Sequence, residues 1–137
     1  MSEAHQKGTR VDARLGDENY RVTLEAGRHR LTADEPASQG GGDAGAAPYE
    51  LLLSGLAACT AITLRMYAQR KGWDLKAVEV AAHLFKHREE AHIERTLSLH
   101  GGLTAEQKAR LLEISEKTPV TLTLKGGIEI RTSVHEG

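Results

Sequence analysis

The first third of the chain alternates apolar and polar residues with a period of two. The alternating positions are Val11, Ala13 and Leu15, then Tyr20, Val22, Leu24 and Ala26, then His29 and Leu31. This period is typical of β-strands, whose successive side chains point to opposite faces. Residues 16–19 and 26–28, which are rich in Gly and Asn, stand where hairpin turns are needed. We therefore expect three antiparallel strands before residue 34.

Residues 34–47 hold almost no large apolar side chain and carry four of the fourteen glycines. Such a composition predicts a loop rather than a helix or strand. With few side chains to pack, this loop is expected to be the most mobile internal segment.

A long helix is predicted to begin at Pro48, because proline fits the first helical turn, and Glu50 suits the positive end of the helix dipole. Apolar residues recur at helical spacing as far as Met66 or Tyr67, and Lys71-Gly72 provide a stop. The first half of this helix is apolar on nearly every side. It is therefore expected to be buried inside a domain or between subunits.

Period-two alternation returns at 78–85 and 93–99, on either side of the polar turn 88–91, and predicts a long hairpin. Thr104 and Gln107 have the spacing of a capping box, which predicts a second helix ending near Thr118-Pro119. Residues 119–124 fit either a short helix or an extended segment.

Alternation at Ile128, Ile130, Thr132 and Val134 predicts a last strand. The predicted order is βββ-α-ββ-α-β, an α+β fold of antiparallel sheet with segregated helices, in a single domain over residues 1–137.

The charge balance and the cysteine count limit the classes of function that the chain can have. The chain has 18 basic and 19 acidic residues and one cysteine. This balance gives no support to nucleic-acid or membrane binding, and a lone cysteine allows no intrachain disulfide. The N-terminus has no apolar stretch behind its charges, so we expect a cytoplasmic protein without a signal peptide or membrane span.

The segment DEPASQGGGDAGAAPYELLLSGLAACTAITL at 34–64 resembles the signature segment of the OsmC/Ohr family of small bacterial thiol peroxidases. The similarity extends through EISEKTPVTLTL at 113–124. It implies an OsmC-like domain in an intertwined homodimer, with the long central helices packed together and the active site at the subunit interface.

The resemblance also implies a catalytic role for Cys59, which matches the cysteine that attacks organic hydroperoxides. The second family cysteine corresponds to Thr118, and the glutamate that follows the proline corresponds to Tyr49, with Glu50 one residue later. The activating arginine aligns with Asn19 or Tyr20, and Arg21 is its nearest substitute.

Two functions remain open at this point. The first is a one-cysteine thiol peroxidase of the oxidative-stress response, in which Cys59 attacks the peroxide, Glu50 or a residue of the other subunit orients the thiol, and an external thiol acts as reductant. The second is a non-catalytic OsmC-like protein that binds a small hydrophobic ligand in the dimer-interface pocket, which Cys59 merely lines.

Other chemistries have weaker support, and no cofactor is expected. His83 and His87 are four residues apart, which on a strand spans about 13 Å, too far for two ligands of one metal ion. The glycines at 40–42 lack the spacing of a phosphate-binding loop. Ser54 lies inside the predicted helix rather than at the strand-to-helix turn of a hydrolase.

Overall fold

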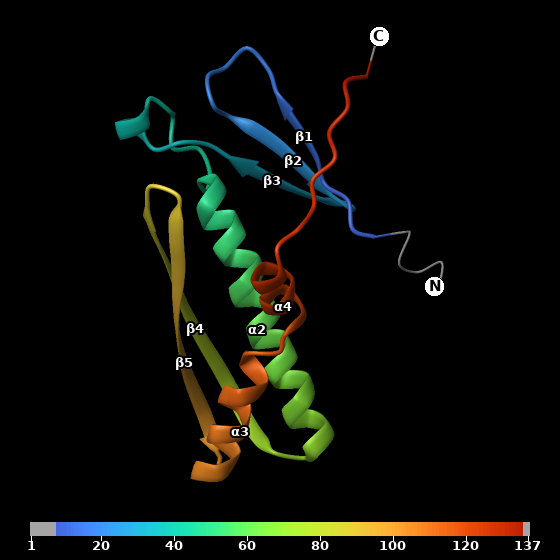
Figure 1. The fold of residues 1–137 in the computed structure, drawn as a ribbon, viewed down its shortest axis with the longest axis vertical. Helices are drawn as coiled ribbons and strands as arrows, with labels where there is room; N and C mark the ends of the chain where they lie inside the picture. The colour runs from blue at the N-terminus through green and yellow to red at the C-terminus, as the bar shows by residue number, and fades with distance from the viewer. Residues whose placement is uncertain (1–7, 136–137) are drawn as a thin grey trace. The chain divides into compact units, whose positions relative to one another are not determined.

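A computed structural model describes residues 8–135, in which the chain forms two compact units (Figure 1). The first unit ends at Leu52 and the second begins at Leu53. The boundary falls inside α2 (Pro48–Lys71), so the two units share one continuous helix.

The first unit is built on a three-stranded antiparallel sheet, as predicted. Its strands are β1 (Asp12–Leu15), β2 (Val22–Ala26) and β3 (His29–Ala33), in the order β1-β2-β3. Gly27, with φ 63°, supplies the left-handed conformation that the tight β2–β3 turn requires. Tyr20 was expected in the second strand, but its φ of 70° places it in the preceding turn.

The loop that follows β3 has an internal framework that its composition did not indicate. The loop contains the 3-10 helix η1 (Ala37–Gln39). Asp34, which is only 2% exposed, holds the loop together through its side chain. One carboxylate oxygen of Asp34 accepts the backbone N–H of Glu35 at 2.7 Å, and the other accepts that of Ala44 at 3.0 Å. The bond from Ala44 is the main reason that the pKa of Asp34 lies below its usual value.

Two glycines of this loop allow close backbone approach. A Cβ atom at Gly41 would overlap the carbonyl oxygen of Glu35, and one at Gly45 would overlap that of Thr32. These positions therefore exclude every larger residue in this conformation.

Helix α2 begins and ends where the sequence predicts. Glu50 Oε1 accepts the backbone N–H of Ala47 at 2.8 Å, and Gly72, with φ 71°, ends the helix. By length and composition α2 could cross a membrane, although core helices of water-soluble proteins meet the same criterion. Only 22% of the apolar 18-residue stretch of this helix is buried, so α2 leaves apolar surface uncovered in this chain.

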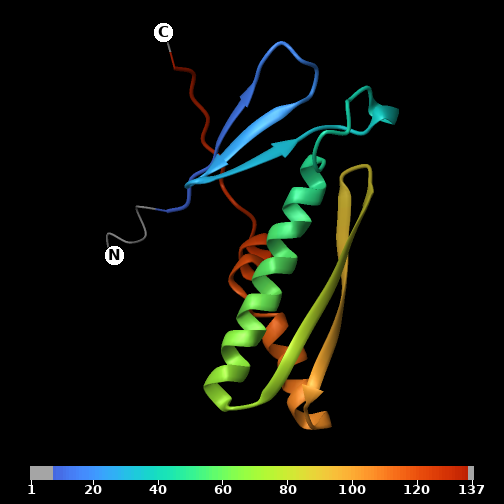
Figure 2. The same cartoon turned by 180° about the vertical axis from the view of Figure 1, so that it is seen from behind.

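In the second unit, a hairpin of β4 (Asp74–His87) and β5 (Glu90–Gly102) runs alongside α2 (Figures 1 and 2). Its inner face carries Val78, Val80 and Leu84 on β4, paired with Leu99, Leu97 and Ile93 on β5. The core lies between this face, α2 and α3 (Ala105–Ser115), around the buried residues Leu64, Ala68, Leu75 and Leu111.

The two short helices close this unit. Helix α3 begins with the predicted capping box, in which the Thr104 and Gln107 side chains each accept the other's backbone N–H. The segment that the sequence left undecided is a helix, α4 (Pro119–Gly126), with its proline at the first turn.

The predicted last strand is wrong. Residues 127–135 form neither helix nor strand, and Ile128, Ile130 and Val134 are 64%, 84% and 82% exposed. An extended segment becomes a strand only when its backbone N–H and C=O groups pair with a neighbouring strand, and this segment has no such neighbour among residues 8–135.

Candidate functional site

Cys59 lies in the middle of α2 with a half-buried side chain. Its sulfur lies 3.9 Å from the hydroxyl oxygen of Thr63, one helical turn further on. Within residues 53–135, no arginine, lysine or histidine side chain hydrogen-bonds this sulfur. A weak hydroxyl contact is therefore the polar environment that the second unit supplies to the thiol.

Cys59 belongs to an apolar stripe on α2, which we define as Gly55, Cys59, Ile62 and Met66. Their spacing of four, three and four residues places them on one face, as in the seam between two coiled helices. Ile62 and Met66 are 55% and 51% exposed. The stripe is thus distinct from the side of α2 that packs on the hairpin, where Leu64 is fully buried.

Glu50, the second predicted catalytic residue, is engaged at the start of α2 through its bond to the Ala47 N–H. Cys59 lies nine positions after Glu50 in the chain, which is about 13 Å along a helix axis. Along this helix, the two predicted residues are therefore not neighbours.

Two other residues that the resemblance singled out, Arg21 and Tyr49, lie in the first unit. Arg21 forms an exposed ion pair with Glu18 at 3.6 Å and contributes to the lowered pKa of Asp34. Tyr49 is 53% exposed.

Sequence reasoning missed the most heavily bonded arginine of the second unit, Arg95 on β5. Its side chain is only 11% exposed. Nη1 donates to the hydroxyls of Thr60 and Thr121, both at 2.9 Å, and Nη2 donates to the carbonyl of Ser115 at 2.9 Å. Arg95 thereby ties β5 to α2, to the end of α3 and to α4.

A signal for Arg95 was present in the sequence. It occupies an inward position in the alternation of Ile93, Leu97 and Leu99, where a charge is unexpected. Its cross-strand partner is the small residue Ala82, which leaves room for the guanidinium. A charged residue on a buried strand face requires polar partners from other elements.

Thr118, which corresponds to the family's second cysteine, is fully buried. Its hydroxyl lies 2.6 Å from that of Thr121, which is one of the acceptors of Arg95. A hydrogen-bonded cluster therefore occupies this position, and the hydroxyl of Thr118 cannot form a disulfide.

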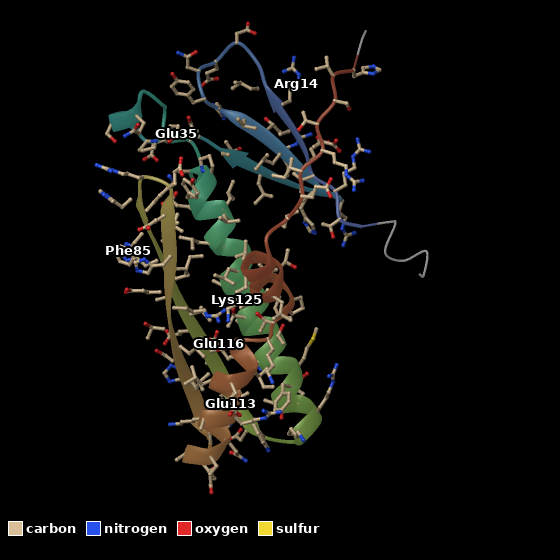
Figure 3. The ribbon with its side chains drawn as sticks, viewed as in Figure 1. Arg14, Glu35, Phe85, Glu113, Glu116 and Lys125 are labelled. Carbon is tan, nitrogen blue, oxygen red and sulfur yellow. The ribbon has the colours of Figure 1, made fainter. Side chains whose placement is uncertain are left out.

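Glu116 and Lys125 lie side by side at the edge of this cluster (Figure 3). Lys125 Nζ donates to Glu116 Oε1 at 2.7 Å, and Arg95 Nη2 lies 3.6 Å from Glu116 Oε2. The bond from Lys125 is the main reason that the pKa of Glu116 is lowered.

Three histidines of the hairpin, His83, His92 and His100, make contacts on its outer face. The ring of Phe85 (Figure 3) stacks on that of His83, with centroids 4.0 Å apart, and on that of His92, with centroids 5.2 Å apart. His100 Nε2 lies 2.9 Å from Glu79 Oε1, within hydrogen-bond distance. In the part of the chain that the structure describes, no three His, Cys, Asp or Glu side chains are grouped to hold a metal ion.

A family model described as OsmC-like protein matches residues 40–133, which is more than half of the chain. The chain belongs to this OsmC-like family. The match contains Cys59, Arg95 and Thr118, so the central helix and the hydrogen-bonded cluster both lie within the family domain.

Solved structures agree with this assignment at the level of the fold. An OsmC-like protein from Mycoplasma pneumoniae is 20% identical, with a TM-score of 0.76 over 87% of this chain and 88% of that one. The organic hydroperoxide resistance protein OhrB of Bacillus subtilis is 24% identical, with a TM-score of 0.61 over 87% and 91%. No curated protein sequence matches the chain.

A third structure is a putative organic hydroperoxide resistance protein from Vibrio cholerae with captopril bound in one of its active sites. It is 22% identical, with a TM-score of 0.63 over 88% of this chain and 87% of that one. At these identities the OsmC-like structures establish the α+β fold, as predicted, and leave the activity of this chain to be argued from its own residues.

Proposed function

We propose that this OsmC-like protein is a cytoplasmic one-cysteine thiol peroxidase of the oxidative-stress response, which reduces organic hydroperoxides with an external thiol. The observation that carries the proposal is the position of Cys59. It is the only thiol in the chain, and it is partly exposed on the apolar stripe of a long helix. An apolar surface around a thiol suits the organic part of a hydroperoxide.

The reaction needs no cofactor, because the peroxide oxidises the sulfur of Cys59 and external thiols then reduce it. The Cys59 thiolate attacks the distal oxygen of the peroxide, the O–O bond breaks, and the leaving alkoxide takes up a proton as alcohol while the sulfur becomes a sulfenic acid. An external thiol then condenses with the sulfenic acid and releases water. A second external thiol reduces the mixed disulfide and restores Cys59.

The proposal requires an external thiol because Thr118 occupies the position of the second family cysteine. A threonine hydroxyl cannot resolve a sulfenic acid as a disulfide. The hydrogen bond between Thr118 and Thr121 gives this position a structural use in its place.

We further propose that the protein acts as a homodimer in which the apolar stripes of two copies of α2 face each other. The stripe has the spacing of a helix–helix seam, and Ile62 and Met66 lie more than half exposed within it. In the dimer, the partner also supplies polar groups to Cys59, with Glu50 or another residue of the partner orienting the thiol.

Peroxide consumption tests this function. Purified protein is mixed with cumene hydroperoxide and, in separate reactions, with dithiothreitol, dihydrolipoamide or glutathione. The wild type is expected to consume peroxide with at least one of these thiols, and Cys59→Ser is expected to fall to the rate without enzyme. Lys71→Ala, an exposed change on the other side of α2 from the stripe, serves as the matched control and should retain the activity.

The alternative function is non-catalytic binding of a small hydrophobic ligand in the dimer-interface pocket. The observation that favours it is the absence of a bonded cation at Cys59 within residues 53–135, because a neutral thiol is a poor nucleophile. Equal peroxide consumption by the wild type and Cys59→Ser would support this alternative.

A further inference from the structure

The second unit contains an open cavity of about 210 Å³ that does not include Cys59 among its walls. Its apolar wall comes from α2, β5, α3 and α4 and consists of Leu56, Ile93, Leu97, Leu112 and Leu124. The cavity is smaller than the ~300–1,000 Å³ of sites for drug-sized ligands. An occupant would therefore be a small molecule with a short apolar part.

The polar wall of this cavity carries unbalanced positive charge. Arg95 is largely buried, and its hydrogen bonds at 2.9 Å all go to neutral oxygens, those of Thr60, Thr121 and Ser115. Buried charges are normally paired with a charge of opposite sign. The hydroxyls and the carbonyl solvate the guanidinium, but they do not neutralise it.

Glu116 is the one carboxylate among the described residues that line the cavity, and it interacts with two cations. Lys125 holds it closely at 2.7 Å, whereas Arg95 lies 3.6 Å away. Two cations and one anion leave a net charge of about +1 on this wall. A small anion entering from the open side would complete the balance.

We propose that this cavity binds a small amphipathic carboxylate, such as a short-chain fatty acid. Its carboxylate lies against Lys125 and Arg95, and its aliphatic chain lies on the wall formed by Leu112, Leu124 and Ile93. Because the cavity wall takes Leu56 from α2 and does not include Cys59, binding at this site does not depend on the reactivity of the thiol.

Methyl and amide NMR during titration with hexanoate tests the proposal on the whole protein. The expected result is saturable shifts centred on Ile93, Leu112 and Leu124. Hexanol, with the same chain and no charge, should bind at least about tenfold more weakly, because a charged hydrogen bond is lost. Raising the salt concentration should weaken the binding of hexanoate and leave the binding of hexanol nearly unchanged.

Variants locate the site without removing the buried arginine, whose loss would perturb the fold. Lys125→Ala should weaken the binding of hexanoate by about three- to tenfold, a modest effect because this lysine is partly exposed. Leu112→Glu, at a residue 57% exposed, should abolish binding by placing a second carboxylate in the cavity. The matched control Lys117→Ala, an exposed lysine outside the cavity, and Cys59→Ser should both bind like the wild type.

Three results would overturn the proposal. These are no saturable shifts at millimolar hexanoate, equal binding of hexanol and hexanoate, or shifts centred on the stripe around Cys59. The first includes the case in which a second copy of the chain covers the cavity. Because Cys59→Ser should still bind, failure of this proposal and failure of the peroxidase function give different results.

Discussion

Arg95 and Thr60 join strand β5 to helix α2, with Nη1 of Arg95 2.9 Å from Oγ1 of Thr60. Thr60 is fully buried and directly follows Cys59 in the chain. The hydroxyl of Thr60 also donates to the carbonyl of Leu56 at 2.7 Å. This relationship fixes α2 against the hairpin at the helical turn that carries the thiol.

Removal of this acceptor should destabilise the protein. Thr60→Val keeps the shape and a similar helix propensity but leaves one N–H of the buried guanidinium unpaired, which costs about 1–3 kcal/mol. Urea unfolding followed by circular dichroism measures the change. Thr63→Val is the matched control on the same helix and should cost less than about 1 kcal/mol, because its hydroxyl makes only a 3.9 Å contact with sulfur.

The Asp34 brace predicts a pH dependence of stability. The pKa of Asp34 is lowered in the folded protein, chiefly by the Ala44 N–H, so the unfolded chain binds its proton more readily. The stabilisation is therefore present above the unfolded pKa, about 3.9, and is lost as pH falls through the lower folded pKa. The melting temperature of Asp34→Asn should lie below that of the wild type at pH 7, and the gap should narrow toward pH 3.

The matched control for this brace is Asp43→Asn, an exposed residue of the same loop that tolerates its φ of 53° as asparagine. It should leave the melting temperature nearly unchanged. A gap between Asp34→Asn and the wild type that stays constant from pH 7 to pH 3 would contradict the role of the carboxylate.

The apolar stripe predicts a dimer that a single charge disrupts. The wild type should be a dimer by light scattering at micromolar concentration. Ile62→Asp should shift it toward monomer, because an unpaired carboxylate in an apolar interface is costly. Lys108→Glu, an exposed change on α3, should remain dimeric. A monomeric wild type would defeat this proposal.

Features set by neighbouring residues were predictable from the sequence. The capping box of Thr104 and Gln107, the stop at Gly72 and the three hairpins each depend on chemistry within a few positions. The signature around Cys59 identified the family because the segment is itself local. These predictions were confirmed by the structure and by the family match.

Features set by distant partners were not predictable in the same way. The acceptors of Arg95 come from three other elements, 20 to 35 positions away in the chain. The backbone N–H of Ala44, ten positions from Asp34, donates to the Asp34 carboxylate and so stabilises the glycine-rich loop. The alternation at Ile128 and Ile130 indicated a strand, but alternation alone supplies no neighbouring strand.

The chemical fate of Cys59 tests the central claim most directly. Protein treated with cumene hydroperoxide without reductant should show, by peptide mass spectrometry, sulfinic or sulfonic acid at Cys59, because no second cysteine can trap the sulfenic acid. Addition of a small thiol before the peroxide should replace these products with turnover or a mixed disulfide at Cys59. The account is contradicted if Cys59 remains an unmodified thiol under an excess of peroxide that oxidises free methionine in a parallel reaction.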